Sequence, residues 1–222
     1  ASYRLDQLVK MSGAGLGVGD KVQSILGCPI NAWRSGTPII PSSYPTPFNS
    51  IISMPVVATP ALIIDGGSGG TDALITMGAQ SSARVAMIQL DSAPSTLNIS
   101  VVSPIGIRRN DFLLAVEQDT TQLFASGVRK PCRLAQVSNS TIVSGDFVQD
   151  PFTLAGTYTK SDGFGTTYSD STRLVDLGVS PRFSAFAIGT DPVNSQANSL
   201  LELDLLQRDS AAAIKRLPEN VI

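Results

Sequence analysis

The 222-residue sequence contains no histidine, and charged residues make up only 15% of it. Without imidazole the chain cannot build a Ser-His-Asp triad, a Cys-His pair or an H-E-x-x-H zinc site. Its two cysteines cannot complete a structural zinc site either. These absences exclude most hydrolases and metalloenzymes, and we expect no enzyme activity, no metal and no cofactor.

Aromatic residues and charges of one sign are also scarce. Aromatics make up 6% of the chain and the net charge is −2, so we expect no nucleic-acid partner, which would need a basic stripe or a stacking platform. No apolar run approaches the roughly 18 residues that a membrane-spanning helix requires, and the sequence shows no signal peptide. Because it begins within a helical pattern and without a cap residue, we expect that an N-terminal segment is missing.

The first feature that is present is a run of glycines in MSGAGLGVGDK, residues 11–21. A dinucleotide-binding fingerprint needs a third glycine at a fixed spacing after a strand, but Val18 or Asp20 occupies that position. Asp20 also interrupts the Gly-Lys pair of a Walker-type phosphate loop. The preceding residues have helical spacing, so we expect Gly13 to end a helix in the left-handed conformation.

Two regions follow this helix. The segment 14–60 contains the proline-rich stretch INAWRSGTPIIPSSYPTPF; because proline lacks the N–H that a strand ladder uses, we expect a long ordered loop wrapped on the surface, anchored by Trp33 and Phe48. In residues 61–222, short apolar runs such as ALIID, FLLAVEQ, CRLAQVS and RFSAFAIG alternate with Gly, Asp, Ser and Pro. This pattern predicts an antiparallel β region. The whole chain, residues 1–222, is then one domain whose helix ends at residue 13.

The sequence GGSGG at residues 66–70 matches the G-x-S-x-G pattern of a nucleophile elbow. Ser68 would have no histidine to activate it, and the apolar run that follows is too short for the helix of an elbow. We therefore expect a flexible turn between strands and no catalytic residue here.

Aspartates lie beside glycines in two loops, where their carboxylates could be oxygen ligands for calcium. Neither loop fits an EF-hand or a G-G-x-G-x-D repeat, so turn formation is the better interpretation. The aspartates concerned are Asp65, Asp72, Asp162 and Asp170. Three other charged residues precede the apolar run FLLAV, and we interpret them as a solvated turn. They are Arg108, Arg109 and Asp111.

Cys28 and Cys132 are far apart in the sequence, which excludes a C-x-x-C redox motif. They are either two unrelated buried thiols or one disulfide, and the residues alone leave both interpretations open.

Several stretches occur in an order typical of one family. The first is a helix that ends at MSGAGLG, and Cys28 follows it. After Cys28 come, in order, GGTDALITMGAQSSA, RRNDFLLAVEQ, KPCRLAQVS with the second cysteine, STRLVDLGVSPRFSAFAIG and SLLELDLLQRD. From about residue 5 to the end, this order resembles the PilW family of type IV pilus minor pilins, which is related to the J-type minor pseudopilins of type II secretion. The leader and the GFTLIE-like start of that family are not present here, so its membrane anchor, processing site and early glutamate cannot be assigned to any residue.

The resemblance implies an α+β, pilin-like fold in which a truncated N-terminal helix packs on antiparallel sheet with a large β-rich head. It implies a Cys28–Cys132 disulfide, because such proteins fold outside the cytoplasm, where disulfides persist. It also implies a structural role: a minor pilin that joins other minor pilins and the major pilin in a complex that initiates pilus assembly at the tip. The head would lie in the periplasm of a Gram-negative bacterium, held to the inner membrane by a helix absent from this chain, and later in the extracellular pilus.

The resemblance also assigns faces to the short helix. Leu5, Leu8, Val9 and Ser12 follow the i, i+3, i+4, i+7 pattern and should pack inward. The set expected to face neighbouring helices in the assembled bundle is Tyr3, Arg4, Gln7 and Lys10. An exposed, frayed helix end is the alternative.

Two other functions fit the composition. The first is a β-rich secreted binding module, such as an adhesin or a phage structural protein. The second is a glycosidase that works through carboxylates alone; Asp65, Asp72, Glu117 and Asp119 could serve it, but no spacing singles out a pair.

Overall fold

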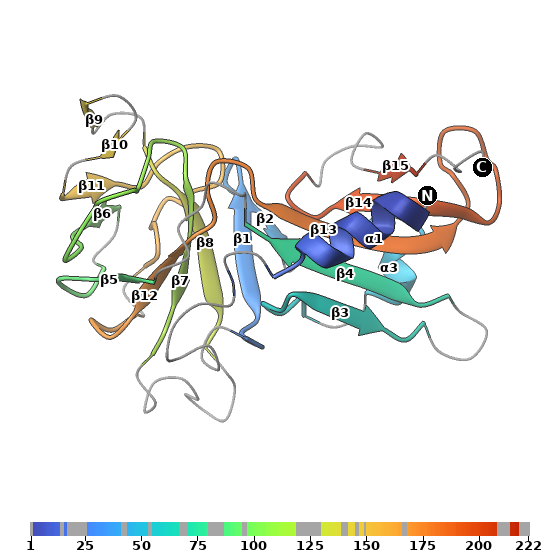
Figure 1. The fold of residues 1–222 in the computed structure, drawn as a ribbon, viewed down its shortest axis with the longest axis horizontal. Helices are drawn as coiled ribbons and strands as arrows, with labels where there is room; N and C mark the ends of the chain where they lie inside the picture. The colour runs from blue at the N-terminus through green and yellow to red at the C-terminus, as the bar shows by residue number, and fades with distance from the viewer. Residues whose placement is uncertain are drawn as a thin grey trace.

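A computed structural model gives the arrangement of the chain. It describes residues 2–13, 16, 26–40, 44–52, 55–66, 71–79, 87–94, 97–118, 130–138, 142–144, 147–148, 150–165, 168–207 and 214–217. Within these residues there are fifteen strands and two short helices, arranged in two larger sheets and two small ribbons (Figure 1). The architecture is therefore mostly β, and the predicted α+β pilin-like fold is wrong.

The first sheet has six strands in the order β2-β1-β8-β7-β12-β5. All neighbours are antiparallel except β1 and β8, which are parallel. Its strands are β1 (Ile30–Arg34), β2 (Thr37–Ile40), β5 (Ile88–Gln89), β7 (Phe112–Val116), β8 (Cys132–Gln136) and β12 (Arg173–Asp176).

Strand β7 is buried along its whole length, because the sheet has a hydrophobic core on each face. Phe112, Leu114 and Val116 point to one core, and Leu113 and Ala115 point to the other. A strand covered on both sides needs a continuous apolar run, which explains the sequence FLLAV.

The second sheet has five antiparallel strands in the order β15-β14-β13-β4-β3. Its strands are β3 (Ala61–Ile64), β4 (Ala73–Gly78), β13 (Arg182–Gly189), β14 (Ser199–Asp204) and β15 (Ile214–Arg216). Alternate residues, such as Ile75, Phe183 and Leu203, enter the core that this sheet shares with β7 and its neighbours. The opposite face of the sheet is the outer face.

The remaining described strands form two small ribbons. Strands β6 (Asn98–Ile99) and β11 (Phe152–Thr153) pair and cover the second core, to which Ile99 and Phe152 belong. Strands β9 (Ile142–Ser144) and β10 (Phe147–Val148) form the other ribbon.

Helix α1 (Ser2–Met11) lies across the outer face of the five-stranded sheet (Figure 1). It ends as predicted: Gly13 has a φ of +84°, and its N–H donates to the Met77 carbonyl at 2.7 Å. A Cβ on Gly13 would stand 2.9 Å from Pro60 Cβ, so the close approach also requires glycine. Neither α1 nor any other helix in the described part of the chain has the length and apolar character needed to cross a membrane.

The proline-rich segment contains strands that were not predicted. It supplies β1 and β2 to the six-stranded sheet and contains the single-turn helix α3 (Phe48–Ile51), so its description as a surface loop without strands is wrong. Pro38 lies in β2, at the sheet edge, where a missing N–H costs no ladder hydrogen bond. Of the two predicted anchors, Phe48 is fully buried, whereas Trp33 is half-buried.

Cys28 and Cys132 form a disulfide, the pairing that the resemblance implied, with 5.7 Å between their Cα atoms. Both cysteines are buried in the core between the sheets. Cys132 begins β8, and its N–H donates to the Pro29 carbonyl at 2.8 Å. The bond therefore ties the start of β1 to the neighbouring parallel strand.

Candidate interaction surface

The outer face of the five-stranded sheet carries polar residues at alternate positions. Ser184 of β13 lies opposite Thr76 of β4 on one side and Asp204 of β14 on the other. Phe186 similarly lies opposite Glu202. Because successive side chains of a strand point to opposite faces, all of these side chains share the face on which α1 rests.

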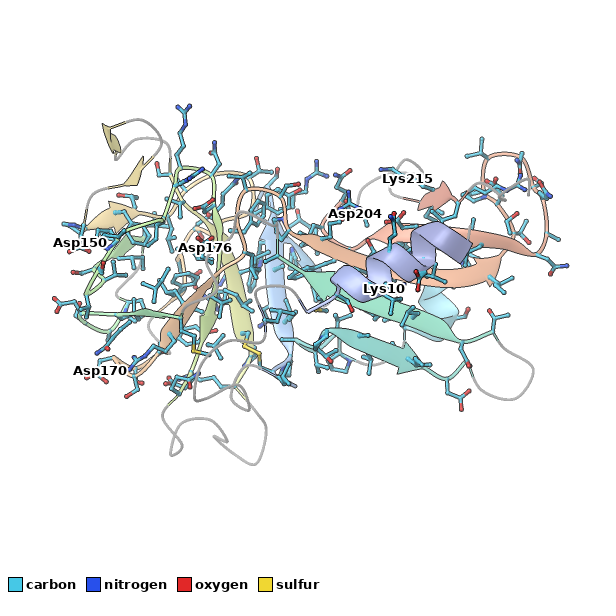
Figure 2. All side chains as sticks on the ribbon, viewed as in Figure 1. Lys10, Asp150, Asp170, Asp176, Asp204 and Lys215 are labelled. Carbon is cyan, nitrogen blue, oxygen red and sulfur yellow. A yellow bond between two sulfur atoms is a disulfide. The ribbon has the colours of Figure 1, made fainter. Side chains whose placement is uncertain are left out.

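A hollow of about 260 Å³ opens on this face. Its walls include the cations Arg182 and Lys215 and the carboxylates Glu202 and Asp204. A smaller hollow of about 30 Å³ reaches Ser12, just beyond α1, and shares Arg182 with the larger one. Figure 2 shows Lys10 on α1, Asp204 at the end of β14 and Lys215 on β15.

The two carboxylates of the hollow have different surroundings. Glu202 is buried, and its Oε1 accepts a 3.0 Å hydrogen bond from the Ser184 hydroxyl. Asp204 Oδ1 accepts from the Leu206 N–H at 2.9 Å.

Burial raises the pKa of Asp204, and the negative charge of Glu202 acts in the same direction. The Leu206 N–H and the charges of Lys215 and Arg182 only partly oppose this rise in the pKa of Asp204. Burial therefore disfavours the charged form of Asp204 even with two cations nearby. With two cations also in its walls, the hollow suits a polar surface that brings charges of both signs.

The helix itself presents a polar outer side. Gln7 and Lys10 are exposed, and Lys10 Nζ lies 2.7 Å from Asp6 Oδ2 on the preceding turn. The side chains of Tyr3 and Arg4, the other two members of the predicted partner-facing set, lie outside the described residues.

The predicted inward side of α1 is only partly correct. Leu5 and Ser12 are half-buried, but Val9 is 39% exposed, so its inward orientation was wrong. The Leu8 side chain lies outside the described residues. A ten-residue helix that packs on one sheet buries fewer of its side chains than the helical periodicity predicted. Val9 is therefore an apolar residue on the exposed side of α1.

The residues considered for calcium do not gather into a site. Asp65 and Asp72 are exposed in the connection between β3 and β4, where Asp72 Oδ1 accepts from the Gly66 N–H at 3.2 Å. Asp162 is bonded to Lys160 and Arg133, and Asp170 is exposed. In the described ranges, no three His, Cys, Asp or Glu residues are placed to hold a metal ion. Ser68 lies outside those ranges.

Glu117, one of the carboxylates considered for glycoside hydrolysis, is buried inside the protein. Its side chain is 1% exposed; Oε2 lies 3.0 Å from Lys130 Nζ, and Oε1 accepts from the Ser169 hydroxyl at 2.7 Å. A carboxylate so enclosed cannot reach a glycosidic bond. Asp119, its sequence neighbour, lies outside the described residues.

The burial of two aspartates was not predicted from the sequence. Arg108 and Arg109 are exposed, in agreement with a solvated turn, but Asp111 is only 3% exposed, so that interpretation was wrong for Asp111. Asp176, at the end of β12, is 2% exposed and was not singled out. The sequence could have indicated this burial, because each of the two aspartates adjoins an apolar strand that is buried on both faces.

The comparisons with known proteins found no match to this chain. No family model, curated protein sequence or solved structure matches the chain. The similarity to minor pilins therefore depends on the order of the sequence motifs.

Proposed function

We propose that the protein is a structural minor pilin that takes part in the initiation of type IV pilus assembly. The observation that carries this proposal is the position of α1, with exposed Gln7 and Lys10, on the outer face of an antiparallel sheet that also carries a charged hollow. A helix held in this way offers one side to neighbouring helices while the sheet offers a complementary polar surface.

The mechanism is association without catalysis. A helix N-terminal to this chain would hold the subunit in the inner membrane of a Gram-negative bacterium, with the described domain in the periplasm and later in the pilus. Partner subunits, which are other minor pilins and the major pilin, would contact the outer side of α1 and the flanking hollow. Charged contacts at the edge of an interface determine the choice and orientation of the partner more than the affinity.

Two further features support this role. The Cys28–Cys132 disulfide is suited to an oxidising compartment such as the periplasm. The exposed side of α1 combines the Asp6–Lys10 pair with Val9, and polar residues around a small apolar group are typical of an interface rim.

The test uses the natural gene in its source bacterium. Deletion should reduce the number of pili, and the wild-type gene should restore it. Charge reversal by Lys10→Glu should leave the folded protein at wild-type abundance while restoring fewer pili. The control, Arg109→Glu, reverses an exposed cation in the turn before β7 and should restore piliation fully. Normal piliation in the deletion strain would refute the proposal.

A second candidate is favoured by the mostly β architecture. A secreted β-rich binding module, such as an adhesin, would also bury one sheet on both faces and display polar loops. The two candidates differ in location: fractionation should find a minor pilin in the inner membrane and in sheared pili. A freely secreted product would favour the binding module.

A further inference from the structure

Asp111 and Asp176 lie close together at one end of the six-stranded sheet. Asp176 pairs with Leu113 in the ladder of β12 and β7. Asp111 stands two positions before Leu113 and so points to the same face. Residues related in this way are diagonal neighbours, with Cβ atoms about 7 Å apart or less.

Both carboxylates border the second hydrophobic core. Leu113 and Leu174, which share their face, belong to that core. Asp111 is 3% exposed and Asp176 is 2% exposed. Two negative charges this near, and this far from water, repel one another strongly, and such pairs hold on to one proton.

The Asp111 side chain bonds to the backbone of the turn before β7, and the Asp176 side chain bonds to the backbone where the chain passes from one sheet to the other. Asp111 Oδ2 accepts from the Arg108 N–H at 2.6 Å. Asp176 Oδ1 accepts from the Gly178 N–H at 2.8 Å. Gly178 belongs to residues 177–181, the crossover that connects β12 of the six-stranded sheet to β13 of the five-stranded sheet.

The same crossover is also bonded to the residue after Asp111. The Phe112 N–H donates to the Gly178 carbonyl at 2.9 Å, and the Leu177 N–H donates to the Phe112 carbonyl at 2.8 Å. A change at the aspartate pair therefore acts directly on the hydrogen bonds that fix the crossover.

We propose that Asp111 and Asp176 share one proton and form a pH-sensitive latch on the crossover between the two sheets. With the proton present, the carboxyl pair carries a single negative charge and the crossover is held. When the proton is lost, two buried charges repel and the crossover loosens. The pair is sealed from substrates, so its role is structural and regulatory rather than catalytic.

The electrostatics agree with this geometry. Burial raises the pKa of Asp111 to about 7, and the charge of Asp176 contributes in the same direction. The Arg108 N–H and the Arg108 guanidinium oppose the rise in this pKa. The charged groups that act on Asp111 thus come from the facing strand and from its own turn.

The direction of the pH effect follows from linkage. The folded-state pKa of Asp111 lies above its ordinary value of 3.8, so the folded protein holds the proton more tightly than the unfolded chain. Folding stability is then greatest below about pH 4 for this group, and it is lost as the pH rises through about 7. A periplasmic or extracellular protein meets this pH range.

The first experiment is a carboxyl titration by NMR on the ¹³C-labelled protein. Asp111 should titrate near neutral pH in the wild type. In Asp176→Asn, which retains an oxygen acceptor for the Gly178 N–H, its midpoint should fall by at least half a pH unit. A midpoint below pH 5 in the wild type, or one unchanged by Asp176→Asn, would overturn the shared proton.

The second experiment measures the consequence for the crossover. The urea midpoint of the wild type should fall between pH 5 and pH 8, and amide exchange at Leu177 and Gly178, corrected for intrinsic pH dependence, should accelerate. Asp111→Asn should remove most of both changes, whereas the exposed control Asp91→Asn should retain them. A pH dependence equal in Asp111→Asn and the wild type would refute the latch.

Discussion

Glu117 and Lys130 form an ion pair of 3.0 Å in which the carboxylate side chain is 1% exposed and the lysine side chain 11% exposed. The same carboxylate accepts hydrogen bonds from the Ser169 N–H at 2.9 Å and the Ser169 hydroxyl at 2.7 Å. Lys130 Nζ also stands 5.2 Å from the centre of the Tyr168 ring. The pair thus joins the end of β7 to the segment just before β12.

Removing one member of this pair should be costly. Glu117→Ala removes the carboxylate that lies 3.0 Å from the buried ammonium of Lys130 and accepts from two Ser169 donors, so we expect a loss of about 3–5 kcal/mol in unfolding free energy. Urea denaturation measures it. The matched control is Asp6→Ala, which breaks the exposed pair with Lys10 and should cost less than about 1 kcal/mol. Equal losses in the two variants would contradict the structure.

The disulfide should contribute a comparable amount. The double variant Cys28→Ser and Cys132→Ser should lose about 2–5 kcal/mol, because the unfolded chain gains the freedom that the cross-link removed. Reduction of the wild type should lower its melting temperature, and the double variant should not respond to the reductant. Free thiols detected in the denatured, unreduced protein would show that the bond is not formed.

Gly13→Ala should destabilise the protein for two separable reasons. An alanine at a φ of +84° is strained by about 1–2 kcal/mol, and its Cβ would meet Pro60 Cβ at 2.9 Å. Gly36→Ala is the control, because Gly36 has a φ of +79° but no atom within 4 Å of the added Cβ. We expect the Gly13 variant to lose more stability than the Gly36 variant in urea denaturation; the reverse order would be inconsistent with the contact.

The proline-rich segment should be essential to the core. Phe48→Ala removes a side chain that is fully buried in the core between the sheets and should cost about 3–5 kcal/mol. Val9→Ala removes an apolar side chain from the exposed side of α1 and should cost less than about 1 kcal/mol. Thermal unfolding of both variants tests whether this segment is structural; similar melting temperatures would argue against it.

Features that depend on local chemistry could be predicted from the amino-acid sequence alone. The helical spacing and the position of Gly13 predicted where α1 ends, because only glycine accepts both the left-handed conformation and the close approach of Pro60. The run FLLAV predicted a strand. The residue types present were also sufficient to exclude histidine-dependent sites.

Burial and pairing depend on elements far apart in the chain, so they were fixed only by the packing of the sheets. Pro38 became part of a strand because β2 lies at a sheet edge, and Val9 remained exposed because α1 rests on the sheet through a narrow stripe. Asp111 has the local pattern of a turn residue, but β12 brings Asp176 beside it and both are buried at the border of the second core. A local pattern records what a residue prefers, whereas the desolvation of a carboxylate is set by the strands that pack around it.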